Sequence, residues 1–155
     1  MIERTKNWGL IKRIITDKSV YSKASEDKSP KPEDYEPVKD DRVYYLLAKN
    51  GMDILGLFVV TPENGVCYKV HTCLLPHSYG EKATVAAKEL VEWVFQNLDC
   101  KRLITEVPEF NKLALKFALR SGMEKYGFNE KSWLKDGHLY GITLLGITNG
   151  GASCQ

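Results

Sequence analysis

The stretch from Tyr68 to Gln96 has the residue types of an anion-binding turn. Most of its first eight residues are apolar or β-prone, Pro76 and Gly80 interrupt the chain after them, and the rest carries apolar residues at helical spacing. A strand that enters a helix through such a turn directs free backbone N–H groups, and the positive end of the helix dipole, at whatever lies in front of the turn. An anion, most often a phosphate, fits this position. An ordinary turn without a ligand explains this stretch alone equally well.

The segments on both sides of the turn predict one mixed sheet. Three strand-like runs lead into it: residues 43–48, 54–60 and 66–75. An Asn-Gly pair joins each run to the next, at Asn50-Gly51 and Asn64-Gly65, which is typical of tight hairpin turns in an antiparallel meander. A further strand at 103–107 follows the central helix. The order strand, crossover helix, strand predicts a right-handed parallel pair.

The remaining elements are expected near the two ends of the chain. They are a strand at 1–5, helices at 8–16 and 20–24, and strands at 126–134 and 139–147 joined by Asp136-Gly137. Residues 25–42, the proline-rich loop, contain three prolines and almost no aliphatic residues. This composition predicts an exposed loop that is either a lid over a substrate or a plain linker. The expectation is one domain over residues 1–148 and a disordered tail at 149–155.

Composition argues against several classes of function. The chain has 155 residues and a formal net charge of +2, so it lacks the charge that draws a protein to nucleic acid or to a membrane surface. Its four cysteines show no CxxC spacing and no signal peptide precedes them, which indicates free thiols in a reducing compartment, the cytoplasm. Its three histidines are scattered relative to the cysteines, so no metal site is predicted.

The turn resembles the pyrophosphate-binding loop of the GCN5-related N-acetyltransferases, the GNAT superfamily. That loop reads apolar-x-Pro-x-x-Arg-Gly-x-Gly/Ala, and Leu74, Pro76 and Gly80 fall in register with it. Tyr79 stands where the family usually has Arg, and Lys82 stands where it usually has Gly or Ala. Lys82 either hinders the approach of the backbone to a phosphate or pairs with the phosphate itself. The resemblance implies that acetyl-CoA binds here as a co-substrate.

A second motif agrees with the first in order and distance. The sequence NKLALKFALRSGM is similar to the family segment Asn-x-x-Ala-x-x-aromatic/Leu followed by Gly-Phe. Without the family, Asn111 is expected to cap a helix over 111–120, which Gly122 ends in a left-handed turn. In the family, this Asn approaches the pyrophosphate and pantetheine of CoA. The two motifs imply these cofactor-binding residues: Leu74, Leu75, Tyr79, Gly80, Glu81, Lys82, Ala83 and Asn111.

The order of the predicted elements agrees with the GNAT core. From residue 43 to about 147 this order is β-β-β-α-β-α-β-β. The resemblance therefore implies an α/β (α+β) fold whose mixed, mostly antiparallel sheet has six to seven strands and flanking helices. It also implies that two central parallel strands separate beyond Leu75, and that the acyl carrier lies in the gap.

The resemblance implies direct attack of an amine on the thioester of acetyl-CoA. Such a reaction needs a backbone donor for the thioester oxygen, a base for the amine and an acid for the leaving thiolate. Leu74 and Leu75 are the expected backbone donors. Glu106 and His71 are the candidate bases, because family bases are common on these two strands and both groups can titrate near neutrality. A solvated Glu106 and a structural His71 are the alternatives.

The acid is missing from its usual position. In many family members a Tyr protonates the sulfur at the position that Ala118 occupies here, and alanine cannot donate a proton. Tyr126 or Tyr79 could replace it, although packing or surface roles explain both tyrosines as well. Cys73 is a possible acyl-accepting nucleophile, but no base can be assigned to it, and packing is the favoured interpretation.

Two functions are compatible with these patterns. The first is an acetyl-CoA-dependent N-acetyltransferase acting on a primary amine of a small molecule or a protein. The second is a non-catalytic GNAT-fold protein for assembly or binding, which Lys82 and Ala118 favour. The short chain and its opening MIERTKNWGLIKRIITD resemble GNAT-like proteins of tailed bacteriophages, some tied to head assembly. That resemblance implies phage structural proteins as partners and the host cytoplasm or the virion as the location. An exposed edge strand would allow a homodimer.

Overall fold

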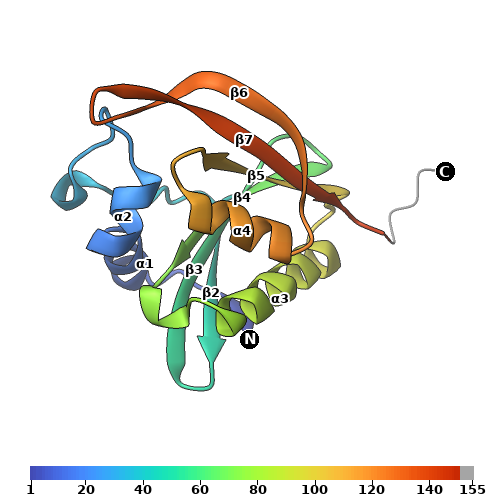
Figure 1. Cartoon of the computed structure of the whole chain (residues 1–155). Helices are drawn as coiled ribbons and strands as arrows, with labels where there is room; N and C mark the ends of the chain where they lie inside the picture. The colour runs from blue at the N-terminus through green and yellow to red at the C-terminus, as the bar shows by residue number, and fades with distance from the viewer. Residues whose placement is uncertain (151–155) are drawn as a thin grey trace.

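One seven-stranded sheet organises the computed structural model, which describes residues 1–150 (Figure 1). Its strands are β1 (Ile2–Arg4), β2 (Tyr44–Asn50), β3 (Asp53–Pro62), β4 (Cys67–Leu74), β5 (Arg102–Pro108), β6 (Glu124–Lys135) and β7 (His138–Thr148). They lie in the order β1-β2-β3-β4-β5-β7-β6. Of the described neighbours, β4 and β5 run parallel, whereas the other pairs are antiparallel. The prediction of a mixed, mostly antiparallel α/β sheet is confirmed.

Helices cover both faces of this sheet. Within residues 1–150 the α-helices are α1 (Trp8–Ile15), α2 (Lys18–Ala24), α3 (Glu81–Asn97) and α4 (Lys112–Arg120). Side chains alternate between the faces along β4. Cys73 packs with α1 and α2 in one core cluster, whereas Val70 and Leu74 pack with α3 and α4 in another. The two clusters therefore lie on opposite faces of the sheet.

All three predicted hairpins join antiparallel strands, and two of the three turns adopt the predicted left-handed backbone. Gly51 adopts a φ of +63°, and Asp136 and Gly137 both have positive φ, as a tight turn between antiparallel strands requires. Gly65 does not adopt a positive φ. Instead, the side chain of Asn64 accepts hydrogen bonds from the backbone N–H groups of Val66 and Cys67, at 3.0 and 2.9 Å, and so organises a longer loop before β4.

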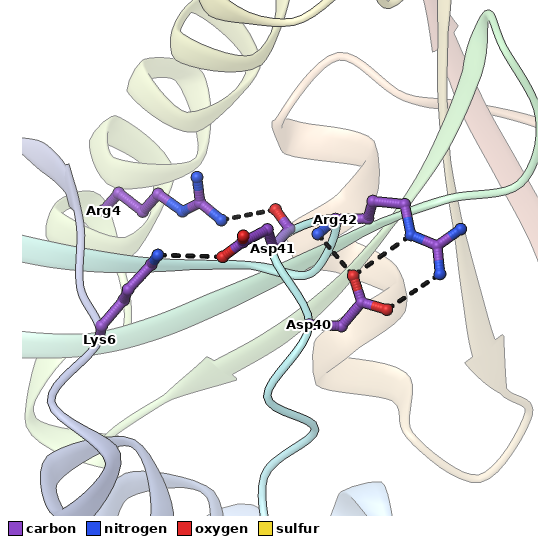
Figure 2. A network of polar contacts seen from close by, with 5 residues as sticks. All are labelled: Arg4, Lys6, Asp40, Asp41 and Arg42. Atoms are coloured by element: carbon purple, nitrogen blue, oxygen red, sulfur yellow. Dashed lines mark hydrogen bonds and ion pairs between the residues drawn. The ribbon is translucent and has the colours of Figure 1, made fainter.

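The proline-rich loop ends in a polar network that ties it to β1 (Figure 2). Arg4 Nη2 donates to the carbonyl oxygen of Asp41 at 2.7 Å, and Lys6 Nζ donates to its carboxylate at 3.0 Å. Beside them, the Arg42 guanidinium contacts both carboxylate oxygens of Asp40, with Nη2 to Oδ2 at 2.9 Å. These contacts order the chain immediately before β2.

The middle of the same loop is also held. Lys12 Nζ pairs with the Glu36 carboxylate at 2.7 Å, and the Tyr45 hydroxyl donates to the Val38 carbonyl at 2.9 Å. No residue of the loop lines the large cavity described below. The loop supports α1 and α2 from outside.

The end of the described chain is attached to the sheet. Asn149 N–H donates to the Lys101 carbonyl at 2.9 Å, although the sequence predicted a disordered tail from residue 149. Residues 151–155 of that predicted tail lie outside the described residues. Among residues 1–150, no helix has both the length and the apolar character needed to span a bilayer.

Candidate active site

The parallel strands β4 and β5 stay paired over a short distance only. Their last backbone pair joins Lys69 to Ile104, although β4 continues to Leu74 and β5 continues to Pro108. The separation of two central parallel strands is therefore present. It begins after Lys69, earlier than the sequence prediction, which placed it beyond Leu75.

The gap between these strands presents backbone N–H groups of β4. Leu75 N–H donates to a β3 carbonyl at 2.9 Å, and N–H directions alternate along a strand, so those of Thr72 and Leu74 face the gap. The Thr105 hydroxyl of β5 donates to Val70 O at 2.9 Å, which agrees with this alternation. Of the two expected donors, Leu74 faces the gap and Leu75 is already bonded to β3. Thr72 is a further donor that sequence reasoning missed.

A cavity of about 410 Å³ lies at this gap. Its wall includes residues of α3 and α4, which pack on one face of the sheet, and residues of α2, which packs on the other. The cavity therefore passes through the sheet between the separated strands. The part lined by Gly80, Ala83, Asn111 and Ala118 is the helical end. The part lined by Ser19 and Lys23 of α2 and by Trp133 of β6 is the hairpin end.

The helical end includes the N-terminus of α3. Gly80 precedes the helix with a φ of +98° and provides no side chain to cap it. The first helical hydrogen bond runs from Thr84 N to Gly80 O at 3.1 Å, so the N–H groups of residues 81–83 have no helical carbonyl to bind. The turn thus has the geometry that favours an anion.

The loop residues predicted to bind cofactor divide into two groups. Ala83 is buried and lines the cavity, whereas Glu81 and Lys82 are exposed and do not contribute to its wall. Lys82 therefore does not obstruct the cavity. Tyr79 lines the cavity, and its hydroxyl accepts a hydrogen bond from Lys23 Nζ at 3.2 Å, which joins the loop to α2.

The start of α4 completes the helical end. Asn111 Oδ1 accepts a hydrogen bond from Ala114 N at 3.1 Å, so the predicted cap is confirmed, and the residue also lines the cavity. Ala118 is buried and lines the same cavity. This position therefore faces the cavity without a proton donor. Within the described wall, Tyr79 is the one tyrosine.

His71 of β4 and Glu106 of β5 both line the cavity. The His71 side chain is exposed at the cavity wall, yet desolvation by the protein packed around it, together with the charge of Lys69, lowers the pKa of His71. A neutral imidazole at neutral pH can accept a proton. Glu106 Oε1 lies 3.3 Å from Lys69 Nζ, which also pairs with Glu63 at 3.2 Å. Of the two candidate bases, Glu106 is the one engaged in an ion pair.

Two other candidates are placed less favourably. Tyr126 of β6 is half exposed and does not line the cavity; the guanidinium of Arg102 lies 5.2 Å from the centre of its ring. Cys73 borders the cavity but is 4% exposed, and burial raises the pKa of its thiol to about 12. Because the thiolate is the nucleophile, this thiol is unreactive near neutrality.

The hairpin end joins α2 and the residues after it to the hairpin of β6 and β7. Lys135 Nζ donates to the carbonyl oxygens of Ser22 and Ser25, at 2.7 and 2.9 Å. The Asp27 carboxylate accepts hydrogen bonds from both N–H groups of the β6–β7 turn, at 2.7 and 2.8 Å. These contacts clamp the end of α2 to the tip of the hairpin, and Figure 1 shows the two side by side.

Trp133 reaches the cavity because β6 is irregular. The pairing of β6 with β7 shifts register between Asn129 and Trp133, and Lys131 within this bulge has a φ of +50°. A bulge redirects the side chains that follow it. No signal in the sequence indicates this bulge, since lysine is not a residue type that marks positive φ.

Solved structures of acetyltransferases share this architecture. Spermidine N-acetyltransferase from Vibrio cholerae, solved with CoA and spermine, matches with a TM-score of 0.79 and 13% identity over 96% of this chain and 94% of that chain. The chain has the GNAT fold. Ribosomal-protein-S5-alanine acetyltransferase from Vibrio fischeri matches with a TM-score of 0.73 and 18% identity over 99% of this chain and 94% of that chain. At these identities the likeness concerns the fold alone.

Sequence comparison gives a more distant relationship. No protein-family model matches the chain. It is similar to protein p31 of Acyrthosiphon pisum secondary endosymbiont phage 1, with 24% identity over 136 residues, which cover 88% of this chain and 84% of p31.

Proposed function

We propose that this protein is an acetyl-CoA-dependent N-acetyltransferase. The cavity through the sheet at the separation of β4 and β5 is the observation that carries the proposal. Acetyl-CoA lies at the helical end, where the N–H groups after Gly80 face its pyrophosphate and Asn111 lies beside its pantetheine. The amine enters at the hairpin end and meets the thioester in the gap.

The backbone of β4 supports the first chemical step. Thr72 and Leu74 direct their N–H groups into the gap, where either can donate to the thioester oxygen as negative charge develops on it. Donors fixed in a strand need little reorganisation during the reaction. The amine nitrogen bonds to the acyl carbon, and the carbon–sulfur bond breaks.

Proton transfer is assigned to His71 and Tyr79. His71 is neutral at neutral pH and lines the cavity, so it takes the proton from the amine. The Tyr79 hydroxyl protonates the leaving thiolate, because Ala118 cannot and Tyr126 lies outside the cavity wall. Lys23 Nζ donates to the oxygen of Tyr79 and orients its ring.

Melting curves with acetyl-CoA test the binding step. A ligand held by the native state alone raises the melting temperature by mass action. We expect a clear rise at millimolar acetyl-CoA, and the absence of any rise would contradict the proposal. Release of free thiol with a panel of primary amines then measures turnover.

Two histidine variants separate catalysis from folding. His71→Asn is expected to keep acetyl-CoA binding and to lose at least about 100-fold in turnover, which is the usual contribution of a general base. His77→Asn is the matched control, because His77 pairs with Asp53 at 3.1 Å and does not line the cavity. Equal turnover in both variants would remove His71 from the mechanism.

A second function is a non-catalytic GNAT-fold protein in phage assembly. Ala118 at the position of the usual proton donor and the similarity to phage protein p31 favour it. The long edge strand β6, with Tyr126 and Phe128 each half exposed, offers a surface for a second copy or a structural protein of the phage. Acetyl-CoA binding without thiol release from any amine would support this function over the first.

A further inference from the structure

Lys69 joins three segments of the chain at the foot of the gap, the point where β4 and β5 are last paired. Its backbone lies opposite Ile104 in that last pair. Its Nζ lies 3.3 Å from Glu106 Oε1 of β5 and 3.2 Å from Glu63 Oε1 of the loop between β3 and β4. One ammonium group therefore holds two carboxylates at the foot of the gap.

The register of the sheet places His71 and Glu106 on opposite sides of the gap. Lys69 and Ile104 are paired, and His71 and Glu106 each lie two residues farther along their strands. Side chains two residues apart on a strand share a face, so both groups point to the same face of the sheet. Both line the cavity, whereas Lys69 is not part of the described wall. The Glu106 carboxylate is therefore placed to pair with a protonated imidazole, unless another cation holds it.

The charges on this face act on His71 in opposite directions. Burial lowers the pKa of His71 most, Lys69 lowers it further, and Glu106 and Glu63 raise it. Burial also lowers the pKa of Lys69, but the hydrogen bonds and charges of its two carboxylate partners outweigh this effect and raise that pKa, so the group is an ammonium at neutral pH. The lysine thus opposes two carboxylates that would stabilise an imidazolium.

We propose that Lys69 is a positioning residue of the candidate active site, which holds the Glu106 carboxylate at the foot of the gap and so leaves the His71 imidazole free to take the proton of the amine. Lys69 acts through Glu106 and does not touch the substrate, because it lies outside the described cavity wall. Glu63 holds the lysine from the other side, and the backbone N–H of Glu63 donates to the Cys67 carbonyl at 2.9 Å. This inference rests on the proposed function, because it takes His71 as the base.

Other charged or titratable groups also lie on the elements around His71. They are Lys23 of α2, Tyr79 of the turn before α3, Cys73 of β4 and Arg102 of β5. Burial raises the pKa of the Cys73 thiol to about 12, so this group is neutral, and the Arg102 guanidinium donates to Thr148 Oγ1 at 3.1 Å. The variants below change none of these groups, so a change in the titration of His71 reports on Lys69 and its carboxylates.

Titration of the histidines by NMR tests the inference without turnover. The chain has three histidines, and the imidazole signals of His71 and His77 are assigned with the variants His71→Asn and His77→Asn. Lys69→Met is expected to raise the pKa of His71 by about one pH unit, because a positive charge is lost and Glu106 is released toward the imidazole. His77, which pairs with Asp53 at 3.1 Å, is the internal control and should titrate as in the wild type. An unchanged pKa of His71 would overturn the inference.

Two further lysine variants distinguish this role from the loss of any ion pair. Lys49→Met breaks the pair between Lys49 of β2 and Glu3 at 2.7 Å, and the Lys49 side chain is 27% exposed, against 20% for Lys69. It should leave the pKa of His71 unchanged, and an equal rise in both methionine variants would overturn the inference. Lys69→Arg keeps a cation that can bind both carboxylates, so it should restore the wild-type pKa. Lys69→Gln, judged by the same outcomes, replaces Lys69→Met if that variant does not fold.

Removal of Glu106 distinguishes positioning from the effect of a charge alone. In the wild type the lysine holds this carboxylate, so Glu106→Gln should lower the pKa of His71 only slightly. In Lys69→Met the carboxylate is released toward the imidazole, so the same substitution should lower that pKa by a larger amount. Such a difference is the coupling that a double-mutant cycle measures. Equal decreases in the two backgrounds would show that Lys69 acts by its charge alone, and would overturn the positioning role.

The pH dependence of kcat/KM separates this inference from the proposed function. The ratio of kcat/KM between Lys69→Met and the wild type, measured with one amine at each pH, cancels the protonation of the amine itself. This ratio should fall about threefold between pH 8.5 and 6.5, because the base of the variant is protonated at a higher pH. A constant ratio in an enzyme that releases thiol would keep the acetyltransferase and reject the role of Lys69. A raised pKa of His71 in Lys69→Met, in a protein whose melting curve ignores acetyl-CoA, would keep the charge arrangement and reject the acetyltransferase.

Discussion

The two ends of the cavity are built from different kinds of contact. At the helical end, the turn at Gly80 and the cap at Asn111 use bonds between residues three or four positions apart. At the hairpin end, Lys135 bonds to Ser22 across 113 residues of sequence, and Asp27 bonds to the β6–β7 turn across 109 and 110. Local chemistry therefore forms one end, whereas tertiary packing forms the other. Variants that damage one end and spare the other test this difference.

The largest expected effect is on stability, at Gly56 of β3, which pairs with β4 next to the cavity. Gly56 has a φ of +145°, and a Cβ there would lie 2.5 Å from the Cys73 carbonyl oxygen on β4. Gly56→Ala must displace β4 or β3, so we expect the free energy of unfolding to fall by about 3 kcal/mol, measured by urea denaturation. Gly65→Ala, where a Cβ meets no atom within 4 Å, is the control. A neutral Gly56→Ala would mean that β4 can shift without cost.

Removal of the clamp should affect the hairpin end alone. Asp27→Ala removes the carboxylate that accepts two backbone N–H hydrogen bonds from the β6–β7 turn. We expect about a fivefold rise in the KM for the amine, with unchanged acetyl-CoA binding. The N–H bonds from Gly137 and Asp136 lower the pKa of Asp27, so the clamp persists at neutral and mildly acidic pH and weakens as the pH falls through that lowered pKa. Asp34→Ala, in an exposed part of the same loop, is the control. Weaker acetyl-CoA binding in Asp27→Ala would show that the two ends are coupled.

Acidification tests the boundary between the ends, where His71 lies. The pKa of His71 is lowered in the folded protein, so below the ordinary histidine pKa of about 6.5 the unfolded chain binds more protons and stability falls as the pH decreases. His71→Asn should lose this pH-dependent part of the stability. Its free energy of unfolding should therefore decrease less between pH 7.5 and 5.5 than that of the wild type. The difference should be at most about 0.5 kcal/mol, because solvent in the cavity screens the imidazole. Equal decreases would contradict burial as the cause of the shift.

The smallest effect is expected at Lys82 in the first turn of α3. Its side chain is exposed and outside the cavity wall, so Lys82→Ala should weaken acetyl-CoA binding about twofold through lost charge, and added salt should reduce the difference. Lys88→Ala, on the exposed side of the same helix, is the control. Tighter binding by Lys82→Ala in calorimetry would mean that this side chain hinders the approach of the phosphate.

Sequence reasoning succeeded where short segments determine their own structure. The meander, the parallel pair, the Asp136-Gly137 turn and the Asn111 cap all follow from residue types close in sequence. The resemblance to the acetyltransferases likewise rested on two short motifs at the helical end. The prediction of a tight turn at Asn64-Gly65 was wrong, because the Asn64 side chain accepts hydrogen bonds from the backbone and organises a longer loop instead.

The missed features depend on contacts between distant segments. The strands separate after Lys69 rather than beyond Leu75, and nothing local marks that point, since β4 keeps its pairing with β3 throughout. Trp133 faces the cavity because of a bulge without the usual residue types. The position of Tyr126 shortly after α4 suggests a place in the site, but the register of β6 on β7 shifts at this residue, and Tyr126 does not line the cavity. Residue types along one strand do not determine how that strand is aligned with its neighbours.

The clamp between Asp27 and the β6–β7 turn has a consequence for biosynthesis. A ribosome has already made α2, β4 and both helices of the helical end before it reaches the hairpin that closes the other end. Contacts between residues this far apart in sequence form late in folding, because the chain between them must first lose the conformational entropy of closing a long loop. The nascent chain can thus form the helical end of the cavity first, and the hairpin end is completed only when the last two strands emerge.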